Sequence, residues 1–253
     1  MASKEHYQEM RNPDYHKDGG CVCRHVIPFK DGDLCSHRWQ GWKESCRSRS
    51  HLYNSYDPSA ITENDLPART LRTWINKKGK EKSYQYQVKS PLKDPTCWYM
   101  GKGSNFMQSS KRPYKHNYHH IITNGELNEK FKVKDGRALI YLIQAKYNIN
   151  HGKNVIPLPK EKKVGKIIKL PIHCPGKARS HPKYSKYVGE QLQDMADEIN
   201  GQLTDKDCEE NKVVVDELKK ELIDLSKELE KKIVALGAKY RGPNIENIGK
   251  LGK

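Results

Sequence analysis

The sequence predicts an α+β fold in which a few short strands precede longer helices. Residues 83–88 alternate polar and apolar side chains with a period of two, and residues 118–122 and 154–158 are two further short strand candidates. Apolar residues spaced three and four apart indicate helices at 135–147, 182–199 and 215–236. The length of 253 residues suits one large domain or two small ones.

The first hundred residues are expected to be irregular, with short strands at best, because turn-forming residues, aromatics and cysteines are frequent there. The chain has seven cysteines, an odd number that cannot pair completely within one chain. One residue separates Cys21 from Cys23, which is not the usual zinc-ligand spacing. Unpaired thiols are therefore favoured over the alternative, a structural zinc held by Cys21, Cys23, Cys35 and either His37 or Cys46.

The middle of the chain alternates short elements with polar loops. Residues 101–117 are rich in Gly, Ser, Lys and Asn and predict a loop. Between 135 and 147 the apolar stripe of a helix is formed by Leu139, Ile140, Leu142 and Ile143. Pro159 closes the strand candidate at 154–158, and residues 160–169 are expected to form a basic loop.

Two long helices follow. Pro182 suits the first position of a helix, where its missing N–H would be unpaired anyway. The last helix keeps one apolar stripe over about three heptads. It is expected to pack on its own domain, in one form as a hairpin with the preceding helix, and the alternative is a dimerisation or partner-binding helix. The stripe consists of Val215, Leu218, Leu222, Leu225, Leu229 and Leu236.

The chain is strongly basic, with a formal net charge of +16 and a pI near 9.4. Residues 119–186 hold 15 basic and four acidic side chains, a net of +11, whereas residues 201–253 are neutral overall. Such an excess favours a polyanionic partner such as nucleic acid. No segment has the roughly 18 apolar residues of a membrane span, and the N-terminus lacks the apolar run of a secretory signal, so neither class of protein is expected.

Histidines gather within this basic stretch. His119 and His120 are adjacent on a strand candidate, so their side chains are expected to diverge and to do different work. One can hold a metal ion, and the other can activate water as a general base. His181, just before a helix, can close the site from the other side. In a basic environment this set suits phosphodiester hydrolysis.

These motifs together resemble the AHH subgroup of the HNH/endonuclease VII (ββα-metal) nucleases, found as toxin domains of bacterial polymorphic toxins and type VI secretion effectors. The resemblance covers roughly residues 115–200. It is carried by His119-His120-Ile121-Ile122, Leu142, the run from Asn154 to Pro159, His173, His181-Pro182-Lys183-Tyr184, Tyr187-Val188 and Leu192.

The resemblance implies a role for each of five residues. His119 and His181 would be metal ligands, and His120 would be the general base. Asn154 would brace the loop that carries the base. His173 would be a further ligand or would contact the scissile phosphate. The basic residues expected to contact nucleic acid are Lys115, Lys153, Lys177, Arg179 and Lys183.

Two positions depart from the family pattern. Tyr118 stands where the subgroup has a small residue, and Ser185 stands where colicin-like relatives have a further histidine on the helix. The third ligand is therefore open, and so is the metal. Histidine ligation favours Zn²⁺, Ni²⁺ or Mn²⁺, whereas relatives with fewer protein ligands use Mg²⁺.

The expected architecture is a small ββα-metal nuclease core at 115–202, an irregular cysteine-containing region of unknown role at 1–114, and an amphipathic helix and tail at 203–253. The resemblance implies an antibacterial toxin, most simply a nonspecific DNA endonuclease. It would be made in the bacterial cytoplasm, exported by a specialised secretion apparatus or adaptor, and active in the target-cell cytoplasm, with an acidic immunity protein as its inhibitor. The alternatives are an RNase toxin and a non-enzymatic nucleic-acid-binding protein with structural zinc.

Overall fold

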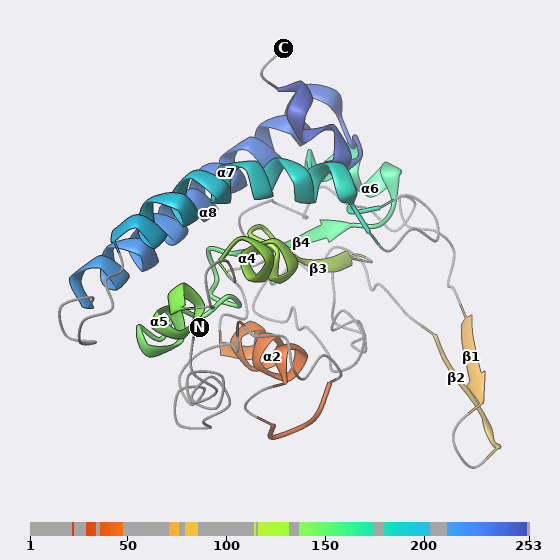
Figure 1. Cartoon of the computed structure of the whole chain (residues 1–253). Coiled ribbons are helices and arrows are strands. Elements are labelled where there is room, and N and C mark those ends of the chain that lie inside the picture. Colours follow the sequence, from red (N-terminus) through yellow and green to blue (C-terminus); the bar gives the residue numbers. More distant parts are fainter. Residues whose placement is uncertain are drawn as a thin grey trace.

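The computed structural model describes residues 22, 29–33, 36–47, 71–75, 79–85, 114, 116–131, 137–174, 180–202 and 212–251. As the sequence predicts, the fold is α+β (Figure 1). Within the described residues there are two antiparallel sheets of two strands each. Strand β1 (Leu71–Ile75) pairs with β2 (Glu81–Gln85), and β3 (His116–His120) pairs with β4 (Val155–Pro159).

The β3–β4 pair begins and ends slightly differently from the sequence prediction. The first strand was expected at 118–122, but it ends at His120 because the chain bends at Ile121 and Ile122. Both bending residues are fully buried, and their backbone groups bond to Asn154 rather than to a continuing ladder. The second strand then starts at Val155.

The described part of the N-terminal region contains a helix that the prediction of irregular structure missed. Helix α2 (His37–Arg47) follows Ser36, whose hydroxyl accepts a hydrogen bond from the backbone N–H of Trp39 at 3.3 Å. A serine in this position caps the first turn of a helix. Cys21, Cys23 and Cys35, which would hold zinc in the less favoured alternative, lie outside the described residues.

Two short helices connect β3 to β4. Helix α4 (Asn124–Phe131) packs against α7 (Pro182–Gln202) and buries Leu127 and Phe131. Helix α5 (Arg137–Gln144), expected within 135–147, packs against α8 (Lys212–Tyr240) through its apolar stripe. Both helices therefore place the β3–β4 pair on the two long C-terminal helices.

The basic loop expected at 160–169 is wrong, because the segment folds as helix α6 (Lys162–Ile168). Val164 and Ile168 are buried, while Lys162, Lys163 and Lys166 point to solvent. The many lysines made the segment look like a loop, although its buried and exposed residues alternate as in a short amphipathic helix. At Gly165 a side chain has no room, since an added Cβ would lie 2.8 Å from the carbonyl oxygen of Leu170.

Helices α7 and α8 lie side by side, as the hairpin expectation required (Figure 1). Helix α7 begins at Pro182, as expected. The apolar stripe of α8 is buried in the same core as α7, so this helix packs on its own chain. Its buried leucines are Leu218, Leu222, Leu229 and Leu236.

The chain after α8 returns to the β3–β4 pair. Asn244 forms a bridge to Ile172, with backbone hydrogen bonds of 2.7 and 3.0 Å on either side of Ile172. The short helix η7 (Ile245–Lys250) follows and packs against α7. This return fixes the segment that leads into His173. Among the described residues, no helix combines the length and the apolar character needed to cross a membrane.

Candidate metal centre and active site

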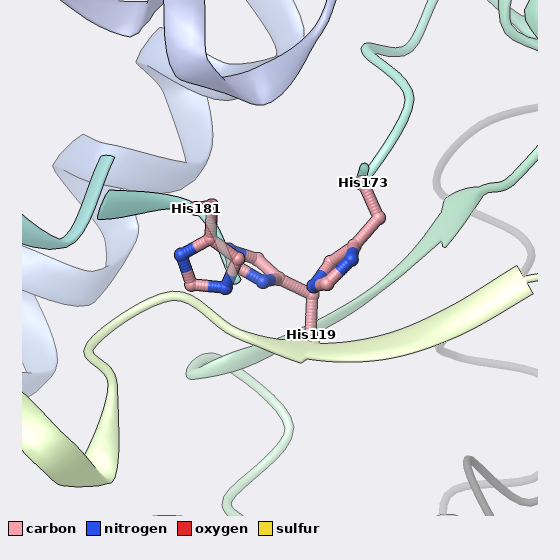
Figure 2. A group of neighbouring side chains, drawn as sticks. All are labelled: His119, His173 and His181. Carbon is pink, nitrogen blue, oxygen red and sulfur yellow. The ribbon is translucent and has the colours of Figure 1, made fainter. Parts of the chain in front are cut away.

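Three histidines from separate segments converge beside β3 (Figure 2). The candidate ligand atoms of His119, His173 and His181 all lie within 4.8 Å of one another. The ring centroids of the three imidazoles are 4.8 to 5.0 Å apart in every pair. Of these residues, His119 and His173 are buried, and His181 is partly exposed.

Each ring is fixed by a different piece of local structure. His119 lies in the ladder of β3, opposite Ile156. The backbone N–H of His173 donates to the carbonyl of Pro159, the last residue of β4, at 3.1 Å. The carbonyl of His181 accepts from Ser185 at 2.9 Å in the first turn of α7. The cluster thus joins the strand pair to the start of a helix.

Tyr184 ties the helix to the strand at this point. It is fully buried, and its hydroxyl donates to the carbonyl of Ile121 at 2.7 Å. The same ring packs edge-on against His119 and His181, with centroid distances of 4.9 and 5.4 Å. One side chain therefore positions His119 of β3 and His181, which directly precedes α7, relative to each other.

Burial keeps the three imidazoles neutral. It lowers the pKa of His119 well below the usual value of 6.5, and the neighbouring histidines add to this effect. Burial also lowers the pKa of His173 to about 3 and that of His181 by a smaller amount. Metal ions bind the neutral form of imidazole, so the cluster is in the ligating state at neutral pH.

The donor set fits a divalent transition metal. Three imidazoles are typical ligands of Zn²⁺ and of related ions. The Nε2 atom of His119 is buried and has no hydrogen-bond partner among the described residues. An unpaired buried polar atom costs free energy, which a bound ion would remove. His119, His173 and His181 are therefore the residues that could hold a metal.

His120 points to the other face of β3. Its ring packs edge-on against Tyr118 at 5.5 Å, and its Nε2 lies 2.7 Å from Oδ1 of Asn150. Because a carbonyl oxygen only accepts, Nε2 of His120 donates, and Nδ1 is the basic nitrogen. Burial lowers the pKa of His120 to about 4, so the ring is neutral at pH 7 and able to accept a proton.

Tyr118, the departure from the family's small residue, belongs to the hydrophobic core. Its side chain is 8% exposed. It shares the His120 face of β3 and leaves the face of His119 to the histidine cluster. The bulky Tyr118 therefore affects the packing on the His120 face of β3, and it leaves the space around the three imidazoles unchanged.

Asn154 braces the turn that follows the two histidines. Its Oδ1 accepts from the backbone N–H of Ile122 at 2.7 Å, and its Nδ2 donates to the carbonyls of Ile122 and Ile149. Ser226 of α8 also donates to Asn154 Oδ1, at 3.1 Å. Three of these bonds hold the turn at Ile122 and the chain at Ile149, and the fourth joins the amide to α8.

The basic residues expected to contact nucleic acid are only partly described. Lys153 and Lys183 are exposed, on the turn before β4 and in the first turn of α7. Lys115, Lys177 and Arg179 lie outside the described residues. The described structure adds exposed Lys162, Lys163 and Lys166 on α6, which follows β4. These lysines were counted in the basic stretch but not proposed as contacts.

Sequence reasoning missed two residues that position the site. Asn150 lies in the Asn-rich turn 148–154, and only this composition could have suggested it. Glu246 comes from η7, and its carboxylate accepts from the backbone N–H groups of Lys183 and Tyr184 at 2.7 and 3.3 Å. It caps the start of α7 from more than sixty residues away, and no local pattern could reveal that contact.

A strand pair followed by a helix, with histidines converging where they meet, has the arrangement expected of a ββα-type nuclease site. The comparison with protein families agrees. Residues 100–228 match the model of AHH, a nuclease family of the HNH/ENDO VII superfamily with conserved AHH, and the chain belongs to this family. Neither the comparison with curated proteins nor that with solved structures gives a match.

Proposed function

We propose that this chain is a metal-dependent endonuclease that hydrolyses phosphodiester bonds in DNA. The observation that carries the proposal is the convergence of His119, His173 and His181 in a member of a nuclease family. The net charge of +16 supports a polyanionic substrate, because basic side chains that neutralise phosphates release condensed counterions.

In this proposal one face of β3 binds the metal ion, and the other face carries the general base. His119, His173 and His181 hold one divalent ion, which would supply positive charge to the scissile phosphate and the leaving oxygen. His120 accepts the proton of the attacking water at Nδ1, while Asn150 fixes the ring through Nε2. Asn154 holds the turn after the two histidines and so keeps both rings in place.

The biological setting is proposed from the resemblance. The chain would act as an antibacterial toxin delivered by a specialised secretion apparatus into the cytoplasm of a target cell. The producing cell would then need an immunity protein, and an acidic one would mask the basic stretch 119–186. Lys153 and Lys183 would contact the phosphates of the substrate, together with Lys115, Lys177 and Arg179.

The test is incubation of the purified chain with plasmid DNA and, separately, with RNA, in Zn²⁺, Ni²⁺, Mn²⁺ or Mg²⁺ and in a chelator. We expect nicked and linear plasmid with at least one ion and intact plasmid in the chelator. Cleavage of RNA alone would replace the proposal with an RNase. Salt-sensitive retardation of DNA without cleavage under any ion would contradict it and favour the binding protein.

A pair of variants tests whether any observed cleavage depends on His120, the proposed base. His120→Ala should lose plasmid cleavage, whereas His116→Ala removes a fully buried histidine from the same strand and outside the cluster. His116→Ala should therefore keep cleavage wherever thermal unfolding shows it folded. Equal loss in both variants would point to a general effect of damaging β3.

A further inference from the structure

The outer nitrogen of His173 faces a buried amide on β3. Asn117 lies two residues before His119, on the same face of the strand. Its side-chain amide is 2.7 Å from Nδ1 of His173. The two side chains are 8% and 7% exposed, so water does not compete strongly for this contact.

The amide has one hydrogen-bonding partner among the described residues. Its Nδ2 faces His173, and its Oδ1 is buried with no partner among the described residues. A half-turn of the amide about its last torsion exchanges the two atoms at similar volume. No other described contact of Asn117 opposes that exchange, so the proton position on His173 decides which atom faces the ring.

Ligation decides the proton position. An imidazole that binds a metal through Nε2 carries its proton on Nδ1, and that N–H needs an acceptor. We propose that Asn117 is a positioning residue of the metal centre, whose Oδ1 accepts the Nδ1–H of His173 and so presents Nε2 as the third histidine ligand. The inference rests on the three-histidine metal centre of the proposed function.

Ser185 offers an internal comparison. Its hydroxyl lies 3.4 Å from Nδ1 of His181, one helical turn along α7. The residue that replaces a histidine of colicin-like relatives therefore faces the outer nitrogen of a proposed ligand. The longer contact and the partial exposure of His181 predict a weaker hold than that of Asn117 on His173.

The test measures metal affinity, with no nucleic acid present. Zn²⁺ is titrated into the metal-free chain against a chromophoric chelator. Asn117→Leu, close in volume and unable to accept, should raise the Kd for Zn²⁺ about 10- to 100-fold. Asn117→Asp restores an acceptor and should stay within about threefold of the wild type, and Ser185→Ala should show a smaller loss than Asn117→Leu.

Two controls separate positioning from damage to the fold. Asn124→Leu removes an amide that is 6% exposed and lies outside the histidine cluster, so it should leave the Kd unchanged. In a His173→Ala background, Asn117→Leu should add no further loss, because its partner is gone. Thermal unfolding of the metal-free variants checks that each is folded.

Four results would overturn the inference. Wild-type affinity in Asn117→Leu, no recovery in Asn117→Asp, or an equal loss in the His173→Ala background would show that Asn117 does not act through His173. A wild-type chain that binds no metal overturns the metal centre itself. A chain that binds metal but cleaves no nucleic acid contradicts the proposed function, while the change in Kd still decides the role of Asn117.

Discussion

The two faces of β3 surround adjacent histidines with different partners. On one face His119 meets two further imidazoles, with ring centroids 5.0 and 4.8 Å away. On the other face His120 donates to Asn150 at 2.7 Å and packs against Tyr118. One face gathers three imidazoles that could hold an ion, and the other orients a single ring through an amide oxygen.

Under the proposed function, the difference means that residue type and burial alone do not set the role of a histidine. Burial is the main cause that lowers the pKa of both His119 and His120. What separates them is the set of neighbours that each face of the strand supplies. Because successive strand residues point to opposite faces, one dipeptide can serve two chemical tasks.

The largest expected effect on activity comes from a substitution in the histidine cluster, on the His119 face of β3. His119→Ala removes the most deeply buried of the three proposed ligands, so metal affinity and cleavage should fall together. We expect at least a 100-fold rise in the Kd for Zn²⁺ and cleavage near background, measured by chelator competition and plasmid nicking. A variant that binds metal as tightly as the wild type would remove His119 from the centre.

A substitution at Asn150 tests the role proposed for His120 on the opposite face of β3. Asn150→Leu removes the acceptor that orients His120, and we expect cleavage to fall about 10- to 100-fold, since misplacing a catalytic group by about 1 Å has that cost. Metal affinity should not change, in contrast with Asn117→Leu. The measurement is the cleavage rate at saturating metal, and a parallel loss of metal affinity would contradict the division between the faces.

Acid should destabilise the metal-free chain through its buried histidines. Burial lowers the pKa of His120 and of His151 to about 4, whereas an unfolded histidine titrates near 6.5. Between these values the unfolded chain binds protons that the folded chain does not, so stability falls as pH drops from about 6.5 to about 4. The Tm of the metal-free chain, followed across this window, is the measurement.

His151 sharpens the acid prediction because it lies outside the metal cluster. Repulsion from His120 when that ring is protonated, and from Lys153, Lys219 and Lys227, adds to burial in lowering the pKa of His151. His151→Gln removes one of the titrating groups and should make the fall of Tm with pH shallower. A Tm that is constant between pH 6.5 and 4 in the wild type would show that these histidines do not control acid stability.

The smallest expected effect is at Glu246, whose carboxylate caps the start of α7. Glu246→Ala should lower the free energy of unfolding by about 1 kcal/mol, which is typical for loss of a helix cap. Denaturant unfolding measures it. Because His181 precedes the same helix, a few-fold weaker binding of Zn²⁺ should accompany the change. An unaltered unfolding curve would show that Glu246 does not stabilise the start of α7.

The strand pair, the long helices and the histidine set could be predicted because local spacing encodes them. The position of Pro182 predicted the start of α7, and the leucine stripe of α8 predicted a buried face. Helix α6 was missed because its lysines dominate the composition, although Val164 and Ile168 carry its buried face. The density of charge correctly predicted a basic surface for this segment but did not predict its helical backbone.

The contacts that position the site depend on tertiary structure. Glu246 reaches α7 from η7, and Ser226 reaches Asn154 from α8, over 72 residues. Neither pairing has a local pattern, because a hydrogen bond between distant segments requires only that the fold bring them together. The sequence therefore singled out the three histidines that converge and Asn154, whose roles stay predictions, but not the residues that hold them.

The most direct test of the division between the two faces is one sample of His120→Ala, assayed for both metal affinity and cleavage. We expect a Kd for Zn²⁺ equal to that of the wild type and plasmid cleavage reduced at least 100-fold, since a general base contributes about 10²- to 10⁴-fold. Cleavage at the wild-type rate, or loss of metal binding together with activity, would contradict it.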